Sequence, residues 1–525
     1  MTPTATTVAS TTPIQTIYST PAEVDDAHRT LHATFRTGIT KDLAWRRWQL
    51  KQLWWLMDEN TDRILDALKA DLNRHHFESL CTDIRSVKSD IISHLKNLED
   101  WTSTQPINTG IPLGSRLFKA RIRKEPLGVA FIMGAWNYPV MLTLQPVVSA
   151  IAAGCCVLLK PSDLSVHSER LLQELVPKYL DPRAIRVVTG GPAETGHMLE
   201  KRFNHIFFTG STKVGRIVAA AAAKHLTPVV LELGGQDPAI VHKTADIDYS
   251  ARRIALAKFQ NAGQVCLSVN HVFVDPEVAD EFVERVSYWC AQFSEGEAAD
   301  HLCRIVNARN FDRLCRLLDA TSGKVVQGGR RDPETRYVQP TVVRDVTLAD
   351  PLMSEELFGP ILPVITATPD EAIRAIGDGP SPLALYIFAR DDAFVERVLD
   401  RTLSGGVTVN NVMVHVVFED APFGGVGDSG YGAYHGRHGV DSFVHRRPVV
   451  QTPSWLDSLV AFTYPPYTMD HAAKLLVKNS LGFKKGETME DQRRVARRGG
   501  LWYAVALGVG GVVAAVGARY LQAGW

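Results

Sequence analysis

The feature that most constrains the fold of this 525-residue chain is a series of short apolar runs separated by helical segments. The runs GVAFIMG, CCVLLK, IRVVTG, HIFFTG and PVVLEL all have the length of a strand, and stretches such as VGRIVAAAAAKHL lie between them. Short strands that alternate with helices are typical of βαβ units, because parallel strands need a long crossover connection. The pattern therefore predicts an α/β protein with a parallel sheet.

The same patterns divide the chain into segments. Apolar residues at three- and four-residue spacing predict amphipathic helices in the first hundred residues, and the alternation in LFKARIRKEP predicts an exposed strand or hairpin. A second region of strands and helices follows the first, so we expect two α/β domains of roughly 200 residues each. The expected segments are a disordered tail at 1–21, a helical region with the first domain at 22–235, the second domain at 236–420, a return to the first at 421–450, and a connector at 451–498.

Composition excludes several classes of protein. The chain has 57 Lys+Arg and 57 Asp+Glu, a formal net charge of zero. Nucleic-acid binding needs clustered, unbalanced Lys and Arg, so nucleic acid is not an expected partner. The seven cysteines form no CxxC pair, so neither a disulfide framework nor a metal site is indicated. We therefore expect a globular protein of a reducing compartment without bound metal.

The C-terminus carries an apolar stretch without a charge, 20 residues from Gly499 to Ala518. A helix of that length would be about 30 Å long, which matches the hydrocarbon core of a bilayer. Basic residues precede the stretch: Lys484, Lys485, Arg493, Arg494, Arg497 and Arg498. The sequence thus predicts a transmembrane tail anchor at 499–521 with the N-terminal part in the cytosol, the alternative being a buried terminal helix.

Two glycine-rich segments are candidates for phosphate binding. Gly425–Gly430 (GVGDSG) matches a dinucleotide-binding pattern, but it neither opens a predicted helix nor lies in a βαβ unit, which favours a structural loop. The second segment instead follows the strand HIFFT and opens a helix; its candidate residues are Gly210, Ser211, Thr212 and Gly215. Free backbone N–H groups and the positive end of the helix dipole suit a pyrophosphate there, although a tight turn with an N-cap would use the same residues.

Polar side chains near strand ends are further candidates. Lys160 and Asp163 follow the apolar strand CCVLLK, where they would hold a ribose or cap a helix. Glu232 lies in LELGG, at the end of an apolar strand just before two glycines. There it would act as a general base, or it would accept hydrogen bonds from nearby backbone N–H groups as a structural residue. Among the cysteines, Cys266 alone follows a small polar run, QNAGQV, which makes its thiolate a candidate nucleophile.

Seven segments together resemble the aldehyde dehydrogenase superfamily: AWNYP, LKPSD, FFTGSTKVG, LELGG, GQVC, EELFGP and PFGGVGDSGYGAYHG. They occur in the family's order, and the resemblance covers about residues 22–450. The last motif, the YPPY of 464–467 and the apolar tail resemble the class 3 branch, particularly membrane-anchored fatty aldehyde dehydrogenases. The resemblance implies a Rossmann-like NAD-binding domain in 22–235, a catalytic domain in 236–420, and small oligomerisation strands in 104–126 and 421–450.

Matched residue by residue, the resemblance gives each candidate a role. Cys266 matches the nucleophile that attacks the aldehyde, and Asn137, in AWNYP, matches the donor that stabilises the oxyanion. Glu232 matches the base that activates water to hydrolyse the resulting thioester. The implied cofactor is NAD, and the implied cofactor-binding residues are Lys160, Asp163, Gly210, Ser211, Thr212, Gly215, Glu356 and Phe358.

The sequence departs from the family pattern at three places. Asp163 stands where many relatives have Glu; an acid there still disfavours the 2′-phosphate of NADP. Gln236 replaces the usual Lys of ELGGK, and the residues after the nucleophile, Leu267–Asn270, differ from those common in the branch. None of these changes removes a reacting group, but they are expected to reshape the pocket.

The expected function is oxidation of medium- and long-chain aliphatic aldehydes to carboxylic acids by a homodimer. Such aldehydes partition into membranes with about 0.8 kcal/mol per CH₂, which suits an anchored enzyme. The endoplasmic reticulum is the expected membrane, with the mitochondrial outer and peroxisomal membranes as alternatives, and a helix at about 468–480 would cover the substrate entrance. The alternative functions are oxidation of aromatic or short aldehydes and a non-enzymatic NAD-binding scaffold.

Overall fold

The computed structural model describes residues 18–108, 114–471 and 485–494. The chain divides into two compact units, with the boundary between Val450 and Gln451. The first unit contains both α/β sheets. The second includes α17 (Leu456–Val460) and a short 3₁₀ turn at Ala461–Thr463.

The first α/β sheet has six strands. In spatial order they are β17 (Gly430–Tyr431), β7 (Val229–Leu233), β6 (His205–Gly210), β3 (Val129–Met133), β4 (Cys156–Lys160) and β5 (Ile185–Val187). Strands β3 to β7 are mutually parallel, and β17 joins β7 antiparallel. The central strands are buried along nearly their whole length, which explains why their sequences are continuous apolar runs.

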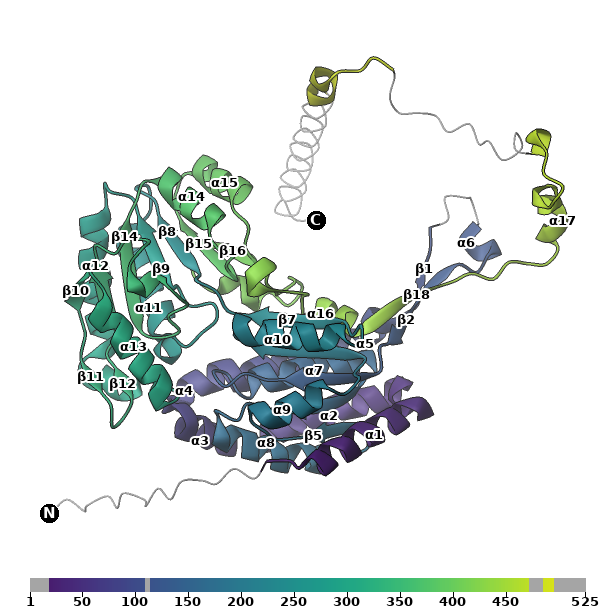
Figure 1. The fold of residues 1–525 in the computed structure, drawn as a ribbon, viewed down its shortest axis with the longest axis horizontal. Coiled ribbons are helices and arrows are strands. Elements are labelled where there is room, and N and C mark those ends of the chain that lie inside the picture. The colour runs from purple at the N-terminus through teal and green to yellow at the C-terminus, as the bar shows by residue number, and fades with distance from the viewer. Residues whose placement is uncertain (1–17, 109–113, 472–484, 495–525) are drawn as a thin grey trace, which may run out of the picture. The chain divides into compact units, whose positions relative to one another are not determined.

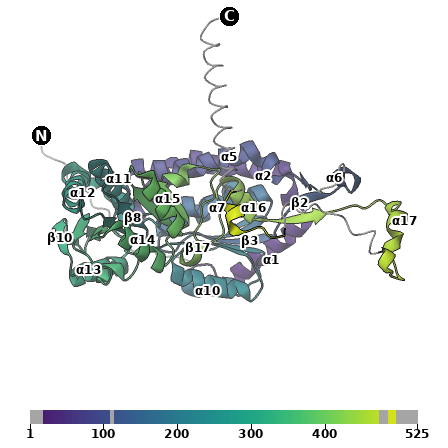
Figure 2. The same ribbon diagram turned by 90° about the horizontal axis from the view of Figure 1, so that it is seen from above.

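Helices cover both faces of this sheet. α7 (Met141–Ala153) packs on β3 and β4, whereas α10 (Thr212–Ala223) packs on β6 and β7. Figure 2 shows these two helices on opposite sides of β3. The other helices of eight or more residues in this part of the molecule are α1 (Pro21–Thr37), α2 (Leu43–Glu59), α3 (Thr61–Leu72), α5 (Arg85–Thr102), α8 (Val166–Tyr179) and α9 (Pro192–Leu199).

The strand order places a topological switch point between β3 and β6. From β3 the chain continues to β4 and β5 on one side, and it then returns to form β6 and β7 on the other. Crossovers that leave in opposite directions open a crevice at the carboxyl ends of the two strands, where open parallel sheets bind ligands. The fold therefore places a ligand site beside the residues that follow Met133 and Gly210.

The second α/β sheet has seven strands. Their spatial order is β10 (Lys324–Gln327), β13 (Thr341–Arg344), β14 (Ile361–Thr366), β9 (His271–Val274), β8 (Pro238–Val241), β15 (Ala384–Phe388) and β16 (Gly406–Val409). All pairs are parallel except β10 with β13. The accompanying helices, labelled in Figure 1, are α11 (Ile247–Phe259), α12 (Ala279–Ser294), α13 (Ala308–Ala320), α14 (Pro369–Asp378) and α15 (Asp392–Arg401).

A third, three-stranded sheet joins distant parts of the chain. β2 (Arg121–Pro126) pairs antiparallel with β1 (Gln105–Pro106) on one side and with β18 (Val444–Val449) on the other. The alternating segment at 104–126 thus contributes strands, and the return of the chain after residue 421 supplies the partner. β18 is the outer strand and most of its side chains are exposed.

The prediction of a C-terminal transmembrane helix is wrong: no helix among the described residues is long and apolar enough to cross a membrane. A span needs about 20 predominantly apolar residues. The longest described helix, α5, has 18 residues and an amphipathic, charge-bearing sequence, and the strongly apolar α7 has only 13. The segment 499–521 itself lies outside the described residues, as does most of the expected cover helix at 468–480.

The predicted fold class is therefore corrected by removing the transmembrane helix: the described residues form an α/β fold with two helix-covered sheets and two small antiparallel sheets. The same finding contradicts the predicted location, a tail anchor in the endoplasmic reticulum or another membrane with a bilayer as partner.

Candidate active site

The nucleophile candidate, Cys266, lies in the segment between α11 and β9. It is the one residue between 261 and 275 that is partly exposed, whereas its neighbours are buried in the core. The local backbone is unusual, because Asn261, Ala262 and Gly263 have φ values of +50°, +53° and +71°. Consecutive left-handed residues are sparsely populated and persist only when surrounding contacts hold them. The thiol is thus presented on a tightly held, strained turn.

Burial is the main electrostatic influence on this thiol. It raises the pKa of Cys266, and the carboxylates of Asp237, Glu356 and Glu232 act in the same direction. Three acidic groups therefore act on the sulfur, including the predicted base Glu232. A bound cation or a cationic ring would lower the thiol pKa again by opposing this negative potential.

Glu232 lies in β7, and only 3% of its surface is exposed. Neither carboxyl oxygen has a hydrogen-bond partner among the described residues. Burial without compensation raises the pKa of Glu232 well above its ordinary value. A buried, unpaired carboxyl group is costly, and its retention in a site with a nucleophile indicates a chemical function more than a structural one.

Asn137 follows β3 and is buried. Its side-chain Nδ2 donates to the carbonyl of Gln264, two residues before Cys266, over 3.1 Å. The side-chain amide of Asn261 donates to the carbonyls of both Asn137 and Gln264. The structure thus brings the AWNYP and GQVC segments into direct contact, although 127 residues separate Asn137 from Gln264.

The predicted pyrophosphate residues lie at the end of β6 and the start of α10. Ser211 is the N-cap of α10, and its hydroxyl accepts from the N–H of Val214 at 3.4 Å. Gly210 is required because a Cβ there would lie 2.5 Å from the ring of Phe208. Gly215 allows close packing, since its Cβ would lie 2.6 Å from the side chain of Leu233. The tight turn and the N-terminus of α10 are therefore both present, and they lie at the switch point between β3 and β6.

The other glycine-rich segment, GVGDSG, packs beside this helix start. It forms a 3₁₀ turn at Gly427–Ser429 and then β17, not the start of a helix. The hydroxyl of Thr212 donates to the carbonyl of Asp428 at 3.1 Å. A Cβ at Gly430 would lie 1.9 Å from the carbonyl oxygen of Leu231, so only glycine allows β17 to approach β7. This is the structural loop that the sequence indicated.

Lys160 and Asp163 lie at the carboxyl end of β4. They form an ion pair at 3.7 Å, and Lys160 Nζ also donates to the carbonyl of Pro161 at 3.1 Å. Burial lowers the pKa of Lys160, and the Asp163 and Glu169 carboxylates oppose that effect. Burial also raises the pKa of Glu169 to about 7. A buried amine beside these acids is a donor that a pair of ribose hydroxyls could use.

Glu356 and Phe358 lie in the loop before β14. Burial raises the pKa of Glu356 to about 7, while the Gly235 N–H and Lys258 favour its charged form. Gly234 is needed beside it, because a Cβ there would lie 2.3 Å from a Glu356 carboxyl oxygen. Phe358 has a φ of +44°, and its ring meets that of Trp136 edge-to-face at 5.3 Å.

The residues that depart from the family pattern help to hold this loop. Gln236 Nε2 donates to the carbonyl of Met353 at 2.8 Å. Asn270 Oδ1 accepts from the N–H of Leu357 at 2.9 Å, between Glu356 and Phe358. Both substitutions therefore connect the nucleophile's surroundings to the loop that carries the two predicted nicotinamide contacts.

Sequence reasoning missed several buried polar groups of the site. Lys258 is 1% exposed, and burial lowers its pKa to about 7 despite the opposing Glu356 and Asp237 carboxylates. Arg74 is fully buried and hydrogen-bonded to Asn261 and Asn137. A lysine in an amphipathic helix and an arginine in a loop carry no sequence signal that separates them from solvated charges.

Comparisons with known proteins identify the family of this chain. Residues 3–449 match the model of the aldehyde dehydrogenase family. The beta-apo-4′-carotenal oxygenase of Neurospora crassa is 40% identical over 498 residues, which cover 94% of this chain and 92% of that protein. Mouse aldehyde dehydrogenase family 3 member A2 is 41% identical, covering 83% of this chain and 90% of that protein. The rat dimeric NADP-preferring aldehyde dehydrogenase is 40% identical, covering 85% and 98%.

Solved structures show the same fold. The substrate-bound AldH of Staphylococcus aureus superposes with a TM-score of 0.82 at 36% identity, over 86% of this chain and 99% of that one. The protein belongs to the aldehyde dehydrogenase family. It is an aldehyde dehydrogenase, an oxidoreductase whose relatives include family 3 members, as the motifs predicted.

Replacement of Glu232 by Gln should stabilise the protein increasingly as the pH rises. The pKa of Glu232 is higher in the folded protein than its unfolded value of 4.5. Above about pH 4.5, folding therefore takes up a proton at this carboxyl group, and the free energy of unfolding of the wild type falls as the pH rises from 5 to 8. Gln does not titrate, so Glu232→Gln should raise Tm by roughly 1–2 °C or more at pH 8 and by less at pH 5. Thermal unfolding followed by calorimetry at both pH values measures this difference.

The matched control is Glu371→Gln. Glu371 is an exposed capping residue of α14, and the Thr368 hydroxyl and N–H lower its pKa, so its replacement should not stabilise. A Glu232→Gln gain that is equal at pH 5 and pH 8 would contradict a raised pKa in the folded state.

Proposed function

We propose that this enzyme oxidises medium- and long-chain aliphatic aldehydes to carboxylic acids, with Cys266 as nucleophile, Asn137 as oxyanion donor, Glu232 as base and NAD as the cofactor. The observation that carries the proposal is the partial exposure of Cys266 in an otherwise buried segment, together with the electrostatic influence on it of Glu232, a buried carboxyl group without a hydrogen-bond partner among the described residues. These are the nucleophile and base that acyl transfer requires.

The first step is attack by the Cys266 thiolate on the aldehyde carbon, which gives a thiohemiacetal. The developing oxyanion accepts from the Asn137 side-chain amide and from the Cys266 backbone N–H. An amide nitrogen has two N–H groups. One of those on Asn137 is bonded to the Gln264 carbonyl, which fixes the direction of the other. The donor is thereby oriented before the substrate arrives.

The second step converts the thiohemiacetal into an acid. NAD, which Lys160, Ser211 and Glu356 would help to hold, would supply the hydride acceptor, so that oxidation of the thiohemiacetal leaves a thioester on Cys266. Glu232 then takes a proton from water as the water attacks the thioester. Burial raises the pKa of Glu232, so a higher pH than for an ordinary Glu is needed to ionise it and make it able to act as a base. Release of a free acid follows from hydrolysis of the thioester.

The cofactor residues fit a dinucleotide. The N-terminus of α10 would provide a pyrophosphate with backbone N–H groups beside Ser211, and it lies at the switch point of the sheet. Lys160 would hold the adenosine ribose, and Glu356 with Phe358 would contact the nicotinamide ribose and ring. Asp163, which is ion-paired with Lys160, would repel the additional phosphate of NADP.

An apolar segment connected to the nucleophile's loop supports a long-chain substrate. Tyr386 Oη donates to the carbonyl of Leu267 at 2.6 Å and accepts from the N–H of Met413, which ties that loop to the 3₁₀ turn at Val414–Val417. Residues 413–418 form an apolar segment. Two of its side chains are exposed, Val417 by 67% and Phe418 by 59%. Exposed apolar side chains on such a segment suit an alkyl chain. The Neurospora relative is likewise named for a carotenal.

A homodimer is the proposed assembly. A rat relative is named as dimeric. The three-stranded sheet ends in β18, a six-residue outer strand that is unpaired on its far side among the described residues. Such an edge is a template for pairing with another strand, so a second copy of the chain is a suitable partner.

Specificity for long aldehydes is tested with straight-chain substrates from butanal to hexadecanal, and with benzaldehyde. We expect kcat/KM to rise with chain length, by about threefold to fourfold per CH₂ that is buried, and hexadecanal to exceed benzaldehyde. Phe418→Ser should lower kcat/KM for hexadecanal by about tenfold and leave butanal nearly unchanged. Steady-state formation of NADH measures each rate.

Two variants control this experiment. Leu226→Ser removes another exposed apolar side chain, remote in sequence from the apolar segment, and should leave the dependence on chain length intact. Cys266→Ala should abolish oxidation of every aldehyde. A strong preference for benzaldehyde over hexadecanal would overturn the proposed substrate class and favour the aromatic alternative.

Cofactor preference is tested at Asp163. Asp163→Asn removes the negative charge beside Lys160, so the ratio of kcat/KM for NADP to that for NAD should rise about tenfold through loss of repulsion. Glu200→Gln, which removes an exposed acid of the same domain, should not change the ratio. An Asp163→Asn ratio equal to that of the wild type would show that this carboxylate does not select the cofactor.

A further inference from the structure

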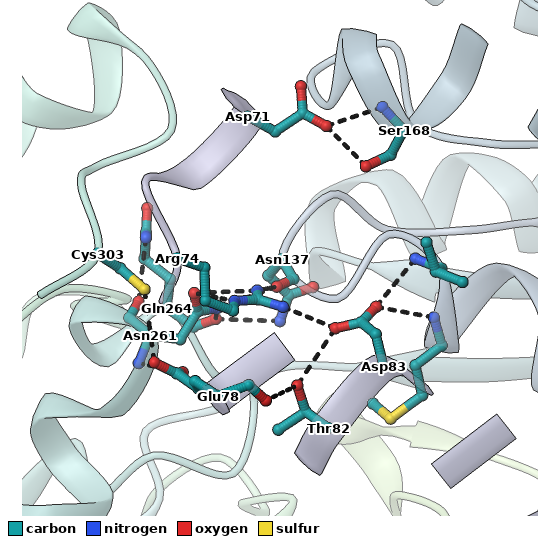
Figure 3. A network of polar contacts seen from close by, with 12 residues as sticks. Asp71, Arg74, Glu78, Thr82, Asp83, Asn137, Ser168, Asn261, Gln264 and Cys303 are labelled. Carbon is teal, nitrogen blue, oxygen red and sulfur yellow. Dashed lines mark hydrogen bonds and ion pairs between the residues drawn. The ribbon is translucent and has the colours of Figure 1, made fainter. Parts of the chain in front are cut away.

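Arg74 is a completely buried charged side chain beside the site. It lies in the loop between α3 and the short helix α4 (His76–Ser79), and none of its surface is exposed. Its guanidinium pairs with Asp83, itself fully buried, with 2.6 Å between Nη1 and Oδ2. The Cζ atom also lies 4.5 Å from the ring centroid of Tyr138. Figure 3 shows the network around this arginine.

The remaining N–H groups of Arg74 contact the two segments that form the proposed oxyanion hole. Nη2 donates to the backbone carbonyl of Asn137 and, at 3.0 Å, to Asn261 Oδ1. Nε donates to the same Asn261 oxygen at 3.2 Å. A planar guanidinium fixes the directions of these bonds relative to one another, which a lysine ammonium cannot do.

Asp83 holds the other end of the Asn137 segment. Its Oδ1 accepts from the backbone N–H groups of Val140 and Met141 at 3.0 and 2.9 Å. These two residues lie at the start of α7, directly after the AWNYP motif. The Arg74–Asp83 pair therefore contacts the backbone on both sides of Tyr138, and it fixes where Asn137 stands.

On the side of the nucleophile, the contacts pass through Asn261 and Gln264. Asn261 Nδ2 donates to the carbonyls of Asn137 and Gln264, and Gln264 Nε2 donates to the carbonyl of Asn261 at 3.1 Å. Gln264 Oε1 accepts from the N–H of Val306 at 3.0 Å. These bonds hold the left-handed turn that precedes Cys266, whose backbone N–H is the second proposed oxyanion donor.

We propose that Arg74 is a positioning residue for the oxyanion hole: it fastens the Asn137 backbone and the Asn261 side chain together, so that the Asn137 amide and the Cys266 N–H converge on one oxygen. The inference rests on the proposed function of Cys266 and Asn137. Displacement of reacting groups by about 1 Å costs roughly 100-fold in rate, so loss of this alignment should appear in turnover.

A purely structural role would predict a different outcome. Buried ion pairs contribute weakly to stability, since desolvation offsets their attraction. Arg46 provides the comparison: it is also buried, but it donates to the carbonyls of Thr40, Lys41 and Ala152, none of which belongs to the site. If Arg74 only stabilised the fold, replacement of either arginine by Lys would affect turnover alike.

The experiment compares Arg74→Lys with Arg46→Lys in the full-length enzyme. We expect Arg74→Lys to lower kcat for aldehyde oxidation about 100-fold, with little change in KM. Hydrolysis of p-nitrophenyl acetate, which needs the thiol and the oxyanion hole but no hydride transfer, should fall in parallel. The Kd for NADH, followed by fluorescence, should stay within about twofold. Arg46→Lys should keep kcat within about threefold, even if its Tm is lower.

Asn261→Asp is the second variant and decides the outcome if Arg74→Lys does not fold. An Asp retains the acceptor for Arg74 but loses the donor to Asn137 and Gln264, so kcat should again fall by at least about tenfold at unchanged NADH affinity. Equal kcat values for Arg74→Lys and Arg46→Lys, or wild-type turnover in Asn261→Asp, would overturn the inference. Undiminished oxidation in Cys266→Ala would instead refute the proposed function itself.

Discussion

The site depends on one geometric constraint, the alignment of the carboxyl ends of parallel strands. In the register of the first sheet, Met133 stands beside both Lys160 and Phe208, so the residues that follow β3, β4 and β6 emerge at one edge. Asn137, Asp163 and Ser211 belong to these emerging segments. From β7, which carries Glu232, the chain passes through the four residues Gly234–Asp237 into β8 of the second sheet. The two sheets are therefore connected at the site.

Burial then gives these positions their chemistry. The acids around Cys266 have raised pKa values because the folded chain removes them from water, and few hydrogen bonds compensate. This is unfavourable for stability and useful for acid–base catalysis, since a carboxyl group with a raised pKa is a stronger base when it is ionised. Lys258 and Glu356, both with pKa values shifted to about 7, extend this group beyond the three predicted catalytic residues.

Much of the fold was predictable from the sequence because strands and helices have different periods. The continuous apolar runs became β3, β4, β5, β6 and β7, and the helix VGRIVAAAAAK became α10. The candidate residues Cys266, Glu232 and Asn137 were found from motifs, yet their convergence was not, because it arises from contacts across more than 100 residues, such as that between Asn137 and Gln264. Their catalytic roles remain predictions.

Sequence patterns did not predict the Arg74 network, and they predicted a membrane anchor that the described residues contradict. The Arg74 network joins residues from α3 onward to a turn near 261, and nothing in the local pattern distinguishes a buried arginine from a solvated one. The membrane anchor shows the opposite error. The uncharged run at 499–518 predicts a span, whereas no helix among the described residues, which do not include that run, is long and apolar enough to cross a bilayer.

The central claim is that Cys266 forms a thioester which Glu232 resolves, and the most direct measurement is the intact mass of Glu232→Gln after reaction with hexadecanal and NAD. The account predicts one added acyl group per chain, located on the peptide that contains Cys266, with a slow release that wild-type enzyme does not show. An unmodified Glu232→Gln protein that turns over at the wild-type rate would contradict the account.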